Sequence, residues 1–268
     1  MRKYYTRPCN FHYGNEAREL ISKKKAFSLT GNQNIAFDKL EIFHRKKKGI
    51  IKSQTYSITE IKTLPKEIKS TIKFDLHKIT SKRKSICGIK FEKPQIMGVL
   101  NVTPDSFSDG GLFFDQSKAY DQASLMINDG AMIIDIGGES TRPGSKIINE
   151  KEEWSRIEKI VAKIKKNFPN VPLSLDTRKS YVMKRGIEYG VNIINDVSGL
   201  NFDKNSFDII NSKRIPFILH HMQGTPDTMQ NNPKYQDALL DIFDFFEKKI
   251  QFFLKNKYKK DFIIVDPG

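Results

Sequence analysis

The chain has 268 residues, enough for one large domain or two modest ones, and its 38% hydrophobic and 11% aromatic content excludes a disordered protein. No apolar run approaches the roughly 20 residues of a membrane-spanning helix, and the N-terminus lacks the apolar segment of a secretory signal. The net charge is +15, and the two cysteines, Cys9 and Cys87, form no CxxC motif, so we expect a cytoplasmic globular protein.

The positive charge is confined to the first third of the chain. Residues 1–95 carry 23 Lys and Arg against 8 Asp and Glu, whereas the remaining residues carry 23 of each. Apolar pieces in this part are short, and we expect short strands and loops there. Because no aromatic-interleaved RNA signature or helix-turn-helix pattern accompanies the charge, residues 1–92 are interpreted as a solvated basic N-terminal extension, and a nucleic-acid partner is not expected.

Residues 93–268 show a regular alternation of strand and helix. Short apolar runs predict strands at 96–100, 132–136, 173–175, 193–195, 217–219 and 262–265. Amphipathic stretches predict helices at 118–128, 152–167, 180–189, 206–212 and 235–253. Strict alternation of this kind is typical of a parallel sheet, either doubly wound or closed into a (β/α)₈ barrel.

Polar residues stand at the carboxyl end of every predicted strand. They are Asn101, Asp135, Asp176, Asn195 with Asp196, His220 with His221, and Asp266. A doubly wound sheet concentrates its ligand groups at one switch point, whereas a barrel gathers them from every strand around one mouth. The sequence therefore predicts an α/β fold of the TIM barrel type, with about six βα units present. No GxGxxG or Walker lysine loop supports a nucleotide-binding site.

Several motifs resemble those of dihydropteroate synthase. They are Asn101-Val-Thr-Pro-Asp-Ser-Phe-Ser-Asp-Gly-Gly111, Asp135-Ile-Gly-Gly-Glu-Ser-Thr-Arg-Pro-Gly144, Leu175-Asp-Thr177, Ile194-Asn-Asp196, His221-Met-Gln-Gly224 and Asp266-Pro-Gly268. The resemblance covers residues 85–268, including a short hairpin at 85–91. It implies a TIM barrel that joins 6-hydroxymethyl-7,8-dihydropterin diphosphate to 4-aminobenzoate in folate biosynthesis, releases pyrophosphate and requires Mg²⁺.

The resemblance also assigns roles to individual residues. It places Asn101 at the metal and diphosphate, and Thr141 and Arg142 near the diphosphate and aminobenzoate. The 2-amino-4-oxo edge of the pterin is expected to meet buried carboxylates and amides. The residues that would surround the pterin are Asp176, Asn195 and Asp266, with Met222 packed against its ring. Asn101, Thr141, Arg142 and Asp176 are the expected catalytic residues.

Some of these residues have simpler interpretations. Asp176 and Asp266 could be helix N-caps, and Asn195 could belong to a turn. Asp135 and Glu139 are interpreted as residues that structure a loop and are left out of the predicted site. His220 and His221 are consecutive strand residues that point to opposite faces, so a shared metal is not expected.

The family pattern continues beyond Gly268, where this sequence stops. Two further βα units are expected, with a lysine and an Arg/His pair that hold the pterin and the diphosphate. We therefore expect this chain to be a fragment of a complete, homodimeric enzyme. The alternatives are a methyltetrahydrofolate-type methyltransferase, which has no diphosphate to bind, and a non-catalytic pterin-binding protein whose basic arm is an interaction module.

Overall fold

The computed structural model describes residues 2–46, 50–103, 116–140, 147–225, 228 and 232–268. The chain divides into two compact units. The first contains Met1–Ser85, Lys90–Glu92 and Gln236–Leu240, and the second contains Ile86–Ile89, Lys93–Tyr235 and Asp241–Gly268. Among the described residues, no helix is both long enough and apolar enough to cross a membrane.

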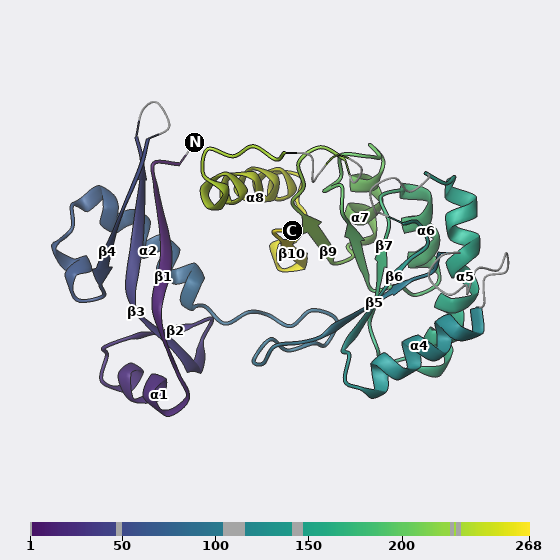
Figure 1. Cartoon of the computed structure of the whole chain (residues 1–268), viewed down its shortest axis with the longest axis horizontal. Coiled ribbons are helices and arrows are strands. Elements are labelled where there is room, and N and C mark those ends of the chain that lie inside the picture. The colour runs from purple at the N-terminus through teal and green to yellow at the C-terminus, as the bar shows by residue number, and fades with distance from the viewer. Residues whose placement is uncertain (1, 47–49, 104–115, 141–146, 226–227, 229–231) are drawn as a thin grey trace. The chain divides into compact units, whose positions relative to one another are not determined.

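The first unit is an antiparallel sheet with two helices (Figure 1). Its elements are β1 (Tyr4–Tyr13), α1 (Gly14–Ser22), β2 (Phe27–Leu29), β3 (Asn32–Arg45), β4 (Ile51–Ser57), the 3₁₀ helix η2 (Glu60–Thr63) and α2 (Lys66–Thr80). The long strand β3 is central, because β1 pairs with it on one side and β2 and then β4 pair with it on the other.

Apolar residues of β3 and α2 form the core of this unit. Phe37 and Leu40 of β3 are fully buried and belong to one cluster with Ile72 of α2. The expectation of short strands and loops was wrong here. Charged residues such as Lys39 and Glu41 interrupt the apolar pattern of β3, and the backbone pairing with β1 and β4 shows that the strand is continuous.

The second unit contains a six-stranded parallel sheet, in which the strands lie side by side in the order of the chain, from β5 to β10. Its strands are β5 (Met97–Asn101), β6 (Ile133–Gly137), β7 (Leu173–Asp176), β8 (Ile193–Asp196), β9 (Phe217–His220) and β10 (Ile263–Asp266). Its helices are α4 (Gln116–Asn128), α5 (Glu150–Asn167), α6 (Ser180–Glu188), α7 (Ser206–Lys213), the 3₁₀ helix η3 (Lys260–Phe262) and α8 (Ala238–Lys255), of which the first three residues are assigned to the first unit.

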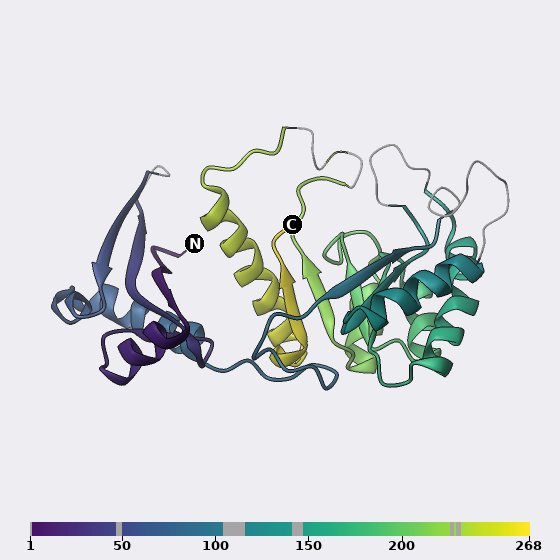
Figure 2. The same ribbon diagram turned by 60° about the horizontal axis from the view of Figure 1, so that its bottom comes forward.

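The two faces of this sheet have different neighbours. Alternate strand residues such as Ile134, Leu175 and Leu219 pack against the helices, which cover one face of the sheet (Figure 2). The side chains of the other face point into the interior of the barrel. The layer of these side chains nearer the amino ends of the strands is apolar, and in it Ile133, Ile193 and Ile218 enclose Ile89. Ile89 follows a tight turn that is closed by an antiparallel bridge to Ile86. At the place of the predicted hairpin the structure has this tight turn with a single bridge and no paired strands.

Helix α5 illustrates why the helices form where the sequence predicts them. The Asn149 side chain accepts a hydrogen bond from the Glu152 N–H, and glutamates occupy the first turn, where the helix dipole favours negative charge. Ile157 and Ile164 are fully buried against the sheet, and each such side chain contributes about 1.5–3 kcal/mol.

The predicted α/β class and TIM-type alternation are confirmed. Every predicted strand and helix of residues 93–268 is present, with bounds that shift by at most three residues. Within the described residues the barrel is not closed, because β5 and β10 each pair on one side only.

Candidate active site

A row of polar side chains lies at the carboxyl ends of the parallel strands. The strand register places Asn101 of β5 beside Gly137 of β6, Gly137 beside Asp176 of β7, and Asp176 beside Asn195 of β8. These residues share the interior face of the sheet, one layer above the apolar cluster around Ile89. Three of the predicted site residues are thus brought together by register alone.

Gly137 leaves the space in which two of these side chains meet. A Cβ at this glycine would lie 3.5 Å from Asn101 Oδ1 and 3.4 Å from Asp176 Oδ2. The side-chain oxygens of Asn101 and Asp176 therefore lie close to Gly137, one from each neighbouring strand. Such an arrangement suits a ligand that carries N–H donors or a bound cation.

Asp135 is a member of this site that the sequence analysis left out. It lies two residues before Gly137, so it faces the same side of β6. Its Oδ2 accepts a hydrogen bond of 2.9 Å from Asn195 Nδ2, which orients the amide of Asn195 and leaves its oxygen available. The alternation of β6 could have identified Asp135, because it shares a face with the polar strand ends.

The electrostatics of the row favour bound protons. Burial, followed by the negative charge of Asp135, raises the pKa of Asp176 well above its ordinary value. Burial also raises the pKa of Asp135. Carboxyl groups in one low-dielectric region do not both ionise readily, so a ligand that donates hydrogen bonds to them replaces protons that they would otherwise hold.

The two histidines after β9 have separate environments. His220 Nδ1 lies 3.3 Å from Asp266 Oδ2, beside it in the register of β9 and β10. His221 is buried against the rings of Tyr235 and Phe245. The expectation that they face opposite ways is confirmed. In the described part of the chain, no group of three His, Cys, Asp or Glu side chains is placed to hold a metal.

The remaining predicted residues differ in what the structure says of them. Met222 is half-buried in the segment after β9. Asp266 Oδ1 accepts a hydrogen bond of 3.0 Å from the Gly268 N–H. Thr141 and Arg142 lie outside the described residues.

A buried ion cluster anchors the loop that follows β6. Glu139 binds Arg178 Nε at 3.0 Å and Lys179 Nζ at 2.8 Å, and Lys179 Nζ also binds Glu153 Oε2 at 2.6 Å. The carboxylate of Glu139 also accepts from the Ile148 N–H at 3.1 Å. This confirms the interpretation of Glu139 as a loop-structuring residue.

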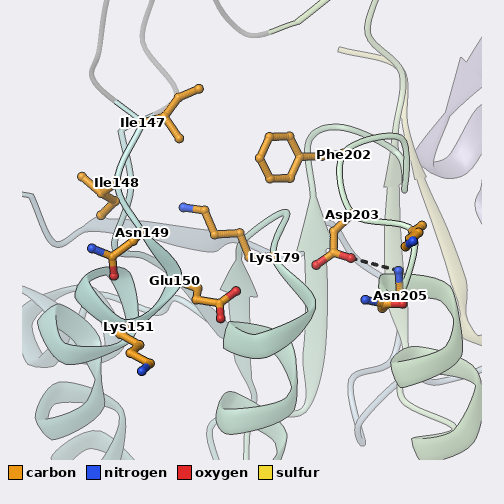
Figure 3. A pocket seen from close by; sticks show the side chains of 10 residues that line it. Ile147, Ile148, Asn149, Glu150, Lys151, Lys179, Phe202, Asp203 and Asn205 are labelled. Atoms are coloured by element: carbon orange, nitrogen blue, oxygen red, sulfur yellow. Dashed lines mark hydrogen bonds between the residues drawn. The ribbon is translucent and has the colours of Figure 1, made fainter.

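A cavity of about 910 Å³ lies beside this cluster, at the beginnings of α5, α6 and α7 (Figure 3). Its lining includes Ile148, Lys179 and Phe202 and none of the polar row on the sheet. Two N–H groups here already have a partner, because Asp203 accepts from the N–H groups of Ser180 and Asn205. Among the described residues, the cavity shares no lining side chain with the candidate active site.

Carboxyl and amide groups converge at the strand ends of this TIM-type α/β sheet, which is where proteins of this fold class bind their ligands. A family model described as pterin binding enzyme matches residues 97–268, and the chain belongs to this family.

Individual relatives agree with this family. The dihydropteroate synthase of Haemophilus influenzae is 41% identical over 175 residues, which are 65% of this chain and 63% of that protein. The Yersinia pestis dihydropteroate synthase in complex with a sulfonamide drug is 39% identical with a TM-score of 0.61, over 67% of this chain and 64% of that chain. The Xanthomonas albilineans dihydropteroate synthase with 4-aminobenzoic acid is 33% identical with a TM-score of 0.61, over 67% and 63%. The chain thus spans less than two thirds of the length of these relatives.

Proposed function

We propose that this chain carries the pterin-binding part of a dihydropteroate synthase, which joins 6-hydroxymethyl-7,8-dihydropterin diphosphate to 4-aminobenzoate. The observation that carries the proposal is the row formed by Asn101, Gly137, Asp176 and Asn195, with Asp135 beneath it. The likeness to synthases from Haemophilus, Yersinia and Xanthomonas supports it.

The polar row is chemically suited to the pterin. The pyrimidine edge of a pterin presents neighbouring N–H donors and a carbonyl, which carboxylate and amide groups complement. Asp176 and Asp266 would accept from the N–H groups, and Asn195, oriented by Asp135, would contribute its free amide oxygen. Met222 would pack against the ring. A site with buried polar groups discriminates strongly, because each group left unpaired costs about 1–3 kcal/mol.

The transfer step needs little covalent chemistry from the protein. The C–O bond to the diphosphate breaks, its electron pair leaves with the diphosphate oxygen, and the amine nitrogen of aminobenzoate bonds to the methylene and loses a proton. Thr141 and Arg142 would bind the diphosphate and the aminobenzoate. We expect the closed site to exclude water from the electron-deficient methylene.

Magnesium is part of the proposal. Mg²⁺ takes one or two protein oxygens and completes its shell with phosphate oxygens and water. Asn101 Oδ1, which is aimed at the space above Gly137, fits that pattern. When bound, the ion would offset the charge of the departing diphosphate.

The test measures binding and transfer separately on the same chain. Isothermal titration with 6-hydroxymethyl-7,8-dihydropterin should show binding that the Asp176→Asn variant loses. With the diphosphate of this pterin as substrate, pyrophosphate release should require aminobenzoate and Mg²⁺. Absence of pterin binding by the wild-type chain would contradict the proposal. Binding without pyrophosphate release would favour the second candidate, a non-catalytic pterin-binding protein.

Two further properties belong to this proposal. A cytoplasmic location is supported by the two cysteines, which are free in the structure. Assembly into a homodimer is supported by apolar side chains exposed on α8, such as Leu239 and Phe243. Light scattering of the complete protein tests the dimer.

A further inference from the structure

The outer face of α2 carries a row of basic side chains. Lys66, Lys69, Lys73 and His77 follow one another at helical spacing, and Lys62 precedes them, with its carbonyl accepting a hydrogen bond from Lys69 Nζ at 3.3 Å. We call these five residues the α2 basic stripe. All are exposed except Lys69, which is half-buried.

The carboxylates of this unit are engaged elsewhere. Each of the eight acidic residues among residues 1–95 binds another group: Glu16 binds His12, Glu19 binds Lys23, Asp38 binds Asn10, Glu41 binds Arg7, Glu60 binds Ser57, Glu67 binds Lys3, Asp75 binds Arg2 and Glu92 binds Lys82. Both acidic residues of α2 itself, Glu67 and Asp75, are thereby turned to residues near β1. Within the described part of the chain, no carboxylate pairs with the α2 basic stripe, so its charge is directed to solvent.

The spacing of the stripe fits a partner with regularly repeated anions. From Lys66 to His77, successive basic residues are three or four positions apart, which is about 4.5–6 Å along the helix. Each strand of a nucleic-acid duplex carries one phosphate per about 3.4 Å of axis, and an unpaired strand also repeats its phosphates regularly, so each lysine can reach a separate phosphate. An isolated anion would need only one or two of these side chains.

An exposed aromatic side chain adjoins the stripe, because Phe74 comes three residues before His77 on α2. Phe74 is 56% exposed, and Lys78 Nζ lies 4.1 Å from the centre of its ring. Aromatic rings beside a basic track are typical of proteins that bind single strands, because unpaired bases stack on them.

A membrane surface fits this helix less well. The apolar face of α2, formed by Ile68, Ile72, Leu76 and Ile79, is packed in the core of the unit. An interfacial helix needs such a face for the lipid, and α2 could supply it only by leaving the sheet.

We propose that the α2 basic stripe and Phe74 bind single-stranded nucleic acid, with the lysines on phosphates and the ring on a base. This surface is independent of the pterin site. It departs from the sequence-based expectation of no nucleic-acid partner, because the lysines become a continuous row only when α2 is recognised as a helix.

The experiment measures binding of the full chain to a fluorescein-labelled oligothymidylate of about 20 nucleotides, by anisotropy, at about 0.05–0.3 M salt. The test variant replaces Lys62, Lys66 and Lys73 by Gln. The matched control replaces Lys23, Lys24 and Lys25 by Gln, which removes the same charge from the same unit.

The stripe variant should bind about 100-fold more weakly near 0.1 M salt, and its salt slope should fall by about 2, as expected when three phosphate contacts are lost from a single strand. The control should change affinity less than about threefold. Equal losses in both variants would overturn the proposal, because binding would then follow net charge only.

A second variant tests the stacking contact. Phe74→Ala should weaken binding about tenfold with an unchanged salt slope, since stacking releases no counterions. An unchanged affinity would overturn the assigned role of the ring. Absence of oligonucleotide binding, or binding of the chain to phosphatidylglycerol vesicles in its place, would overturn the whole proposal. Circular dichroism of each variant verifies that it is folded.

Discussion

Asp176 is a residue whose charge works against the folded state. An aspartate in an unfolded chain titrates near pH 3.9, and burial in this fold raises the pKa of Asp176 well above that value. Between the two values the folded state holds more protons than the unfolded state, so stability falls as the pH rises through this window. At neutral pH this buried carboxyl group therefore lowers the stability of the folded state, which its role in ligand binding would explain.

Asp176→Asn should therefore gain stability and lose pterin affinity. We expect the Tm at neutral pH to rise by about 2–4 °C, and the affinity for 6-hydroxymethyl-7,8-dihydropterin to fall about 100-fold, because the amide replaces one acceptor by a donor. Wild-type affinity should increase with pH, since the ligand prefers the ionised carboxylate. Asp121→Asn, at an exposed position of α4 outside its first turn, should change neither quantity. A lower Tm for Asp176→Asn would show that the carboxylate stabilises the fold.

The consecutive histidines allow a matched pair of substitutions. His220→Gln should weaken dihydropterin binding about tenfold, because it removes the group that holds the Asp266 carboxylate. His221→Gln should lower the Tm with little effect on binding, because it disturbs the ring contacts with Phe245. Calorimetric titration and thermal melting of both variants check this separation, and equal effects on both quantities would contradict it.

The pH dependence of stability provides a further check on His221. Burial lowers the pKa of His221 from its ordinary value of 6.5. The unfolded chain therefore binds a proton first on acidification, and stability falls as the pH drops through about 6.5. His221→Gln should lack this contribution.

At the scale of elements, two adjacent glycines at the end of β6 have different roles. A Cβ at Gly138 would lie 2.7 Å from the Glu153 carbonyl oxygen of α5, whereas a Cβ at Gly137 meets only ordinary contacts with Asn101 and Asp176. Gly138→Ala should therefore destabilise the protein by about 1–3 kcal/mol through displacement of α5. Gly137→Ala should leave stability nearly unchanged and weaken dihydropterin binding. Denaturant unfolding and titration distinguish the two, and a stable Gly138→Ala variant would show that α5 can shift freely.

The elements of the second unit could be predicted because each strand is a short apolar run that ends in a polar residue. The candidate site could be predicted because parallel strands bring these polar residues to the same edge of the sheet. Asp135 was missed because its position inside β6 was interpreted as structural, although alternation places it on the same face as Gly137. The ion pairs of Glu139 could not be predicted, because Arg178 and Lys179 come from another loop, about 40 residues away. In the first unit, Ile68, Ile72 and Ile79 recur at helical spacing and could have revealed α2.

At the scale of the molecule, charge and chemistry are divided between two units. The basic excess belongs to residues 1–95, and the residues of the proposed pterin site belong to a part of the chain with balanced charge. The α2 basic stripe and the polar row belong to different units, so we expect the effects of substitutions in them to add. The two proposed activities can therefore fail or hold independently.

The open edges of the parallel sheet determine how the 268-residue chain behaves at high concentration. In the described residues β10 pairs only with β9, and Val265 on this edge strand is 47% exposed. An unpaired edge with an apolar side chain is a template for pairing with another chain. We expect concentration-dependent association of the wild-type chain and less association after Val265→Lys, because a lysine on an edge strand opposes pairing. Leu125→Lys, which makes the same change at an exposed position of α4, should associate like the wild type. Light scattering over a concentration series checks this, and a wild-type chain that stays monomeric throughout would show that the β10 edge is protected.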